Sequence, residues 1–187
     1  MTRYDSSKHR RRSIRLPQWD YRALGYYFVT ICTWRRETLF ANPAYHDIAA
    51  HALQRVPQQP HARHVQLDGW VIMPNHVHVI FLLVGEPLDE AVGEAAGLQN
   101  APAGSLGVVV GRYKTAVSTP INQLRRGEKT AVWQRGYYER IIRNDRELQA
   151  TRQYIADNPL RWAEDRDNLD KLLVKMTRHP HGRDGAG

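Results

Sequence analysis

His76 and His78, which are separated by a single residue, are the side chains whose type and spacing best suit metal chemistry in this chain. They follow Pro74 and Asn75, a pair typical of a tight turn, and they open an apolar run that indicates a strand. Because side chains alternate along a strand, both imidazoles are expected on one face. Neutral histidine is a common metal ligand, so the pair could share one divalent cation. Alternatively, both histidines are structural.

A second group of functional side chains is expected on a helix late in the chain. Asn144 is a good N-cap, and Glu147 three residues later completes a capping-box pattern. Pro159 is expected to end this helix, because the residue before a proline resists helical geometry. Tyr154 and Asn158 are four residues apart and therefore share one helix face. They offer a hydroxyl and a carbonyl oxygen; alternatively, they are a core-edge aromatic and a helix stop.

Other histidine pairs are weaker candidates for a metal site. His179 and His181 have the same spacing as the first pair but lie in a polar tail, where nothing fixes their geometry. His61 and His64 lie beside Pro60 in an expected loop.

The composition is that of a globular chain with a basic balance. The 187 residues are 42% hydrophobic and carry a formal net charge of +8, which suits one domain and a polyanionic partner, either nucleic acid or an anionic membrane surface. The single cysteine excludes an internal disulfide. No segment is apolar and long enough for a membrane span, and the basic N-terminal segment lacks the apolar centre of a secretory signal. A cytoplasmic protein is expected.

The hydrophobic patterns predict an α+β domain, with helices packed on an antiparallel sheet of four to five strands. Strands are expected over residues 26–34, 65–73, 76–84 and 131–142. Helices are expected over residues 42–56, 106–126 and 144–159.

Composition also divides the chain into an arm, a domain and a tail. Residues 1–22 form a basic N-terminal arm, 23–165 the folded domain and 166–187 a C-terminal tail. Residues 85–107 are rich in glycine and alanine and are expected to form a surface loop or flexible insertion. The arm could bind phosphates or be a solvated tail.

Basic and aromatic side chains that could bind a nucleic acid are spread along the chain. The basic candidates are Arg10, Arg11, Arg12, Arg15, Lys114, Arg125 and Arg135. Trp19, Tyr21 and Tyr113 could stack on unpaired bases, although Tyr113 is better explained as a helix aromatic packed on the sheet.

Five segments together resemble the REP-associated tyrosine transposases, a family of the HUH (histidine–hydrophobe–histidine) single-tyrosine superfamily. They are RRSIRLPQWDY, YYFVTICTWRRETLF, WVIMPNHVHVIF, VWQRGYYERIIR and QYIADNPLRW. They occur in the family's order and extend over about residues 11–162.

The resemblance implies a ferredoxin-like HUH domain that binds a divalent metal, Mg²⁺ or Mn²⁺, through His76 and His78. It implies that Tyr154 is the nucleophile and that Asn158 is the third metal ligand. The implied substrate is single-stranded DNA with a palindromic REP hairpin, which is cut and rejoined through a 5′-phosphotyrosine intermediate. Where many members have a histidine, this chain has Arg140.

The resemblance leaves the assembly and the exact activity open. Related insertion-sequence transposases are dimers that exchange tyrosine helices, so both a monomer and a homodimer are compatible with it. A rolling-circle-type nickase or relaxase uses the same chemistry, but such enzymes are usually larger and often have extra histidines or a second tyrosine. A hairpin-binding module without cleavage activity is the other alternative. Each of these DNA-binding proteins would associate with the nucleoid.

Overall fold

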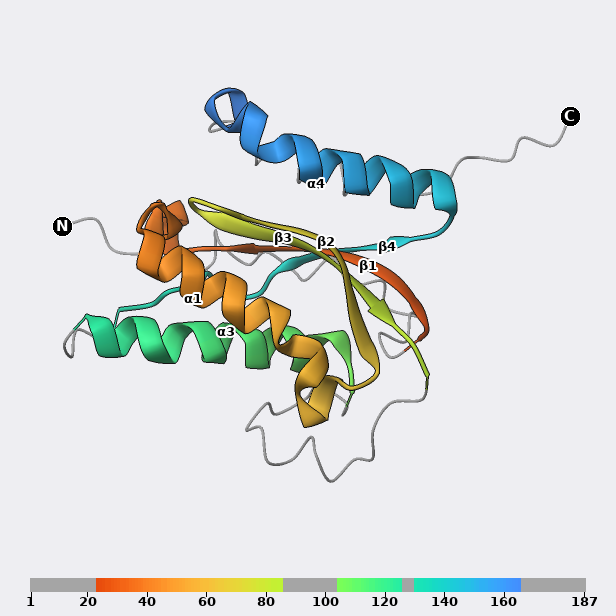
Figure 1. Cartoon of the computed structure of the whole chain (residues 1–187), viewed down its shortest axis with the longest axis horizontal. Helices are drawn as coiled ribbons and strands as arrows, with labels where there is room; N and C mark the ends of the chain where they lie inside the picture. Colours follow the sequence, from red (N-terminus) through yellow and green to blue (C-terminus); the bar gives the residue numbers. More distant parts are fainter. Residues whose placement is uncertain (1–22, 86–103, 126–129, 166–187) are drawn as a thin grey trace, which may run out of the picture.

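A computed structural model describes residues 23–85, 104–125 and 130–165. These residues form a four-stranded antiparallel sheet with the strand order β2-β3-β1-β4, and helices cover both of its faces (Figure 1). The expected α+β class is confirmed. None of the described helices combines the length and the hydropathy that crossing a membrane requires.

The main elements follow one another in an order close to the one expected. They are β1 (Gly25–Cys32), α1 (Pro43–Gln54), β2 (Val65–Met73), β3 (His76–Leu83), α3 (Leu106–Leu124), β4 (Tyr138–Ile142) and α4 (Asp145–Asp165). Short 3-10 turns connect them: η1 (Trp34–Arg36), η2 (Leu39–Ala41), η3 (Val56–Gln58) and η4 (Pro60–Ala62).

The sheet separates two hydrophobic cores. Helices α1 and α3 pack on one face, over the larger core, to which β3 contributes Val77, Val79 and Phe81 (Figure 1). Helix α4 packs on the other face, where Leu148 and Ile155 meet a smaller cluster that includes Phe28, Ile80 and Ile142. Because side chains alternate along β3, its two histidines face α4 rather than the larger core.

Two expected boundaries are wrong. Pro159 lies inside α4, which continues to Asp165. A proline removes one N–H donor and disfavours helical geometry before it, but the turns beyond it pack on the sheet through Trp162. The expected strand 131–142 is regular only from Tyr138. Gly136, just before it, takes a left-handed φ of 80°, which interrupts the extended backbone. Further upstream, Trp133 forms an isolated bridge with Thr33.

Several expectations lie outside the described residues. The N-terminal arm 1–22, the tail 166–187 and the part of the expected insertion over 86–103 belong there. At its other end the expected insertion overlaps a regular element, because α3 begins at Leu106.

Candidate active site

The two histidines of β3 lie side by side in the interior, on the face covered by α4. Their Nε2 atoms are 3.0 Å apart, and the side chains of His76 and His78 are almost completely buried, at 3% and 0% exposure. The antiparallel pairing of β3 with β1 sets Thr30 opposite His78 and Cys32 opposite His76.

Both imidazole rings are oriented by neighbours that the sequence analysis does not single out. Nδ1 of His76 donates to Oδ1 of Asn75 at 2.7 Å, and Nδ1 of His78 lies 2.8 Å from Oγ1 of Thr30. The ring of Phe28 stacks on His78 with centroids 5.2 Å apart. Such partners fix the ring orientation of a metal-binding histidine. Strand alternation on β1 could have indicated Phe28 and Thr30, but only the pairing register links them to His78.

Burial keeps both imidazoles neutral. It lowers the pKa of His76 to about 3, and the positive charge of Arg36 acts in the same direction. Burial lowers the pKa of His78 well below its ordinary value, with a further contribution from His76. The neutral imidazole is the form that binds a metal ion.

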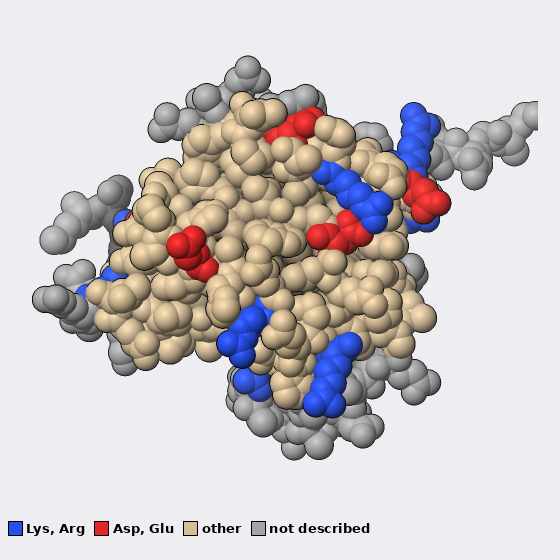
Figure 2. Space-filling model, in the orientation of Figure 1, with Lys and Arg blue, Asp and Glu red and all other residues tan. Residues whose placement is uncertain are grey.

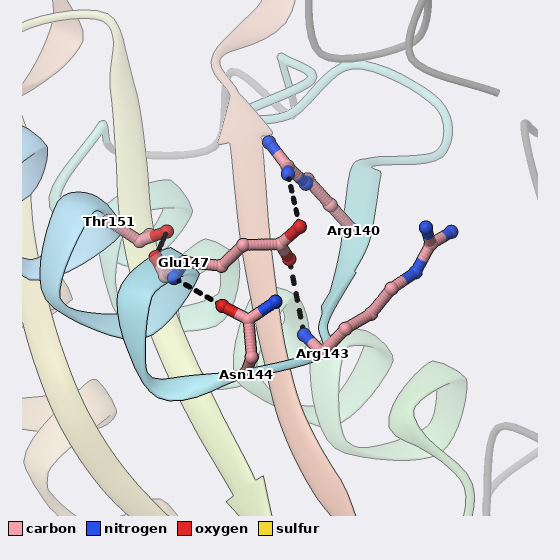
Figure 3. Close-up of polar contacts among 5 residues, drawn as sticks. All are labelled: Arg140, Arg143, Asn144, Glu147 and Thr151. Atoms are coloured by element: carbon pink, nitrogen blue, oxygen red, sulfur yellow. Dashed lines mark hydrogen bonds and ion pairs between the residues drawn. The ribbon is translucent and has the colours of Figure 1, made fainter. Parts of the chain in front are cut away.

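Helix α4 begins at the expected N-cap, and Glu147 completes a variant of the capping box. Oδ1 of Asn144 accepts from the backbone N–H of Glu147 at 2.9 Å, and Oε2 of Glu147 accepts from the N–H of Arg143 at 3.1 Å (Figure 3). The other oxygen of Glu147 lies 3.2 Å from the Arg140 guanidinium. Arg140 therefore ties β4 to the first turn of α4.

Three residues at four-residue intervals bring α4 against the histidines. The Tyr154 hydroxyl lies 3.2 Å from Nε2 of His78, and the Trp162 ring is centred 6.1 Å from the ring of His76. Asn158 lies between them on the same helix face and is 2% exposed. The structure thus brings the four predicted site residues together, on one side of the sheet and within one chain.

An ion pair between distant parts of the chain fixes α4 on the sheet. Nε of Arg152 donates to Oδ1 of Asp68 at 2.8 Å, and Nη2 donates to Oδ2 at 2.5 Å. The hydrogen bond from Arg152 is the main reason that the pKa of Asp68 is lowered. Asp68 lies at an irregularity of β2, beside Gly69, and a Cβ on that glycine would lie 3.6 Å from Ile155. Nothing in the sequence around either residue predicts this contact.

The donor atoms fit a divalent cation. Nε2 of His76 and Nε2 of His78 are 3.0 Å apart, close enough for the two neutral imidazoles to bind one ion together. Nδ2 of Asn158 is buried and has no hydrogen-bond partner among the described residues. Because amide oxygen and nitrogen are not distinguished by shape, the rotated amide would offer an oxygen ligand. No three His, Cys, Asp or Glu side chains cluster in the described ranges.

Three of the expected DNA-binding side chains, Lys114, Arg125 and Arg135, belong to the described residues. Lys114 donates to the carbonyls of Gln134 and Gly136, at 2.9 and 2.5 Å, and burial lowers its pKa to about 8. Arg125 lies over the ring of Tyr45 at 5.6 Å. On the face drawn in Figure 2, the described basic side chains are scattered among acidic ones.

The remaining candidates for nucleic-acid contacts divide between the surface, the core and the undescribed arm. Arg135 is exposed, whereas Arg10, Arg11, Arg12 and Arg15 lie outside the described residues. Tyr113 is buried in the larger core and donates its hydroxyl to the carbonyl of Ala49 at 3.3 Å, which confirms the structural interpretation of this residue.

Comparison with known proteins defines the class of fold. The solved structure of a REP-associated tyrosine transposase bound to a REP hairpin superposes with a TM-score of 0.55 and covers 92% of each chain, at 18% sequence identity. The chain therefore has the fold of that transposase, as the resemblance in the sequence implies.

The family is shown by a sequence relative. An uncharacterized protein of Haemophilus influenzae (strain ATCC 51907 / DSM 11121 / KW20 / Rd) is 32% identical over 182 residues, which cover 90% of this chain and 99% of that protein. The chain belongs to the same family as this protein. No protein-family model matches the chain.

Proposed function

We propose that this protein is a metal-dependent, single-tyrosine transposase that cuts and rejoins single-stranded DNA at palindromic hairpins. The observation that carries the proposal is the meeting of the Tyr154 hydroxyl with the neutral imidazoles of His76 and His78 beside the buried Asn158 amide. The fold, which is that of a transposase whose structure contains a REP hairpin, supports the choice of DNA.

His76, His78 and Asn158 are the residues that would hold the cation, either Mg²⁺ or Mn²⁺. When bound, such an ion neutralises a non-bridging phosphate oxygen and orients the phosphate for in-line attack. Thr30 and Asn75 keep the imidazoles in the orientation that this binding needs.

Tyr154 is the proposed nucleophile. Its hydroxyl oxygen attacks the scissile phosphorus and forms a P–O bond, while the bond from phosphorus to the 3′-oxygen breaks. The tyrosine gives up one proton, and the leaving oxygen takes one up, to give a free 3′-OH and a 5′-phosphotyrosine. This ester retains the reactivity of a phosphodiester, so a second 3′-OH can attack it and rejoin the strands without ATP.

The proposed domain organisation assigns DNA binding to the basic arm, residues 1–22, and catalysis to residues 23–165. Deletion of residues 1–20 should weaken hairpin binding and flatten its dependence on salt. The logarithmic slope should fall by roughly 0.7 for each single-strand phosphate that the arm neutralises in the full-length protein. An unchanged slope would mean that the arm is a solvated tail.

A covalent-adduct assay tests the activity. The wild-type protein, incubated with a labelled hairpin carrying single-stranded flanks and Mn²⁺, should form an adduct that survives denaturation, and excess EDTA should prevent it. Tyr154→Phe should form none while binding the hairpin within a few-fold of wild type. Tyr45→Phe, a matched change on α1, should keep the adduct.

Two results would redirect the proposal. An adduct that persists in Tyr154→Phe would identify another nucleophile. Tight hairpin binding by the wild type without any adduct would favour a binding module that lacks cleavage activity.

A further inference from the structure

The turn that follows β1 has an unusual backbone. Arg35 and Arg36 are successive residues with φ of 52° and 58°, a left-handed conformation that residues other than glycine rarely adopt. Hydrogen bonds hold the turn: the N–H of Arg36 donates to the carbonyl of Thr33 at 3.1 Å, and Oγ1 of Thr33 donates to the carbonyl of Glu37 at 2.7 Å. Such conformations cluster at functional sites, where the surrounding structure enforces them.

This turn is attached directly to the candidate active site. The backbone N–H of Thr33 donates to the carbonyl of Asn75 at 3.0 Å, and the hydroxyl oxygen of Thr33 lies 2.9 Å from the same carbonyl oxygen. Asn75 is also the residue whose side chain accepts from His76. The charge of Arg36 is close enough to His76 to act on that imidazole.

The side chains of the turn present an aromatic surface beside a cationic group. Trp34 is 40% exposed. The other large hydrophobic side chains that are exposed in the described residues are leucines, so Trp34 is the aromatic one. The Arg35 guanidinium lies 5.8 Å from the centre of its ring. Arg35 is exposed and Arg36 half-buried, and together they outnumber the one carboxylate of the turn, Glu37.

We propose that Trp34, Arg35 and Arg36 form a nucleotide subsite beside the candidate active site. An unpaired base stacks on the Trp34 indole, next to the Arg35 guanidinium, and the adjoining phosphate pairs with Arg36. Aromatic stacking accepts any base with a free face, and a guanidinium matches the geometry of a phosphate. A paired stem has no free base face, so the subsite selects the single-stranded flank of a hairpin. This inference rests on the proposed function and adds to it the contact with the flank.

Binding of two DNA ligands, measured by fluorescence anisotropy, tests the subsite. One is a hairpin with single-stranded flanks, and the other is the same hairpin without them. Trp34→Ala should weaken binding of the flanked hairpin about 5- to 100-fold, the range expected for removal of one stacking platform, and leave the bare hairpin unchanged. Trp34→Phe should restore most of the affinity, since it restores an aromatic face.

Arginine variants test the phosphate contact. Arg36→Gln should reduce the logarithmic salt slope for the flanked hairpin by about 0.7, the value for one single-strand phosphate. Arg63→Gln is the matched control, because Arg63 is exposed and distant from the turn. It lies just before Val65, which pairs with Leu83 at the end of β3 that is farther from His76. This control should leave the affinity and the slope unchanged.

The outcomes separate this inference from the proposed function. If the wild type binds the flanked hairpin and Trp34→Ala binds it equally well, the subsite alone is overturned. An equal loss of affinity for both hairpins would also overturn it, because Trp34 would then bind the stem. If the wild type binds neither hairpin, the proposed function fails and the subsite fails with it. Urea denaturation of each variant shows whether it is folded. If Trp34→Ala is not folded, the salt slope of Arg36→Gln carries the test, and an unchanged slope would overturn the subsite.

Discussion

Nε2 of His78 lies 3.2 Å from the hydroxyl of Tyr154 and 3.0 Å from Nε2 of His76. One nitrogen atom therefore connects the proposed nucleophile to the proposed metal ligands. A cation held by His78 would compete with the Tyr154 hydroxyl for this nitrogen. The interaction between Tyr154 and His78 would consequently stabilise the metal-free protein and oppose metal binding.

This competition predicts that Tyr154→Phe binds Mn²⁺ more tightly than the wild type does. The variant lacks a hydrogen bond that exists only without metal, and one such bond is worth about 0.5–1.5 kcal/mol, or roughly 2- to 10-fold in affinity. Titration calorimetry with Mn²⁺ measures the difference, and Tyr45→Phe should bind as the wild type does. Weaker binding by Tyr154→Phe would instead identify the tyrosine as a metal ligand.

The buried histidines predict a stability that depends on pH in the metal-free protein. Their pKa values are lowered on folding, that of His76 to about 3, against about 6.5 in the unfolded chain. Below pH 6.5 the unfolded chain therefore takes up protons that the folded chain does not. Stability is fully present above about pH 6.5 and falls as the pH is lowered toward 3, by up to about 1.4 kcal/mol per pH unit for each histidine.

Urea denaturation in EDTA between pH 7.5 and 5 measures this effect, because most carboxylates do not yet titrate there. His76→Gln should reduce the slope of stability against pH, whereas replacing the exposed His51 by Gln should not. A wild-type stability that stays constant over this interval would contradict the neutral, buried state of the pair.

The parts of the site that follow local rules could be predicted from the sequence. Strand alternation is sufficient to put His76 and His78 on one face, and helix periodicity does the same for Tyr154 and Asn158. The capping pattern correctly marks the start of α4 at Asn144. Each of these rules needs only residues that are close in sequence.

The parts that depend on tertiary contacts could not be predicted. Asp68 and Arg152 are 84 residues apart, and neither has a distinctive sequence context. Helix α4 continues past Pro159 because Trp162, which lies beyond it, packs near His76. This packing outweighs the local tendency of a helix to end before a proline. The left-handed turn at Arg35 is likewise held by the hydrogen bonds within residues 33–37 and by those to Asn75 rather than by its own residue types.

Two asparagine caps among the described helices provide a matched comparison. Oδ1 of Asn144 accepts from the N–H of Glu147 at the start of α4, and Oδ1 of Asn42 accepts from the N–H of Ala44 at the start of α1. Replacement of either by alanine should lower the free energy of unfolding by about 0.5–2 kcal/mol. Only Asn144→Ala should also slow adduct formation, because only α4 carries Tyr154. Equal slowing by both variants would mean that global stability, and not the position of α4, limits the reaction.

The ion pair between Asp68 and Arg152 predicts a defect in catalysis without a defect in binding. It fixes α4 to β2 two residues before Tyr154. Asp68→Asn removes the charge, and Arg152→Lys removes the two-pronged geometry. Each should slow formation of the adduct in a single turnover by roughly 10- to 100-fold, since a displacement of about 1 Å is enough for such an effect. Hairpin affinity should change by no more than a few-fold.

A reciprocal exchange distinguishes positioning from a general loss of structure. The double variant Asp68→Arg with Arg152→Asp restores opposite charges in reversed order, and it should recover part of the rate that either single reversal removes. Amide hydrogen exchange over α4 should be faster in Asp68→Asn than in the wild type and unchanged over α1. Arg146→Gln, at an exposed position of the same helix, should alter neither measurement. If the single variants keep the wild-type rate while exchange over α4 increases, the ion pair stabilises the helix but does not position the tyrosine.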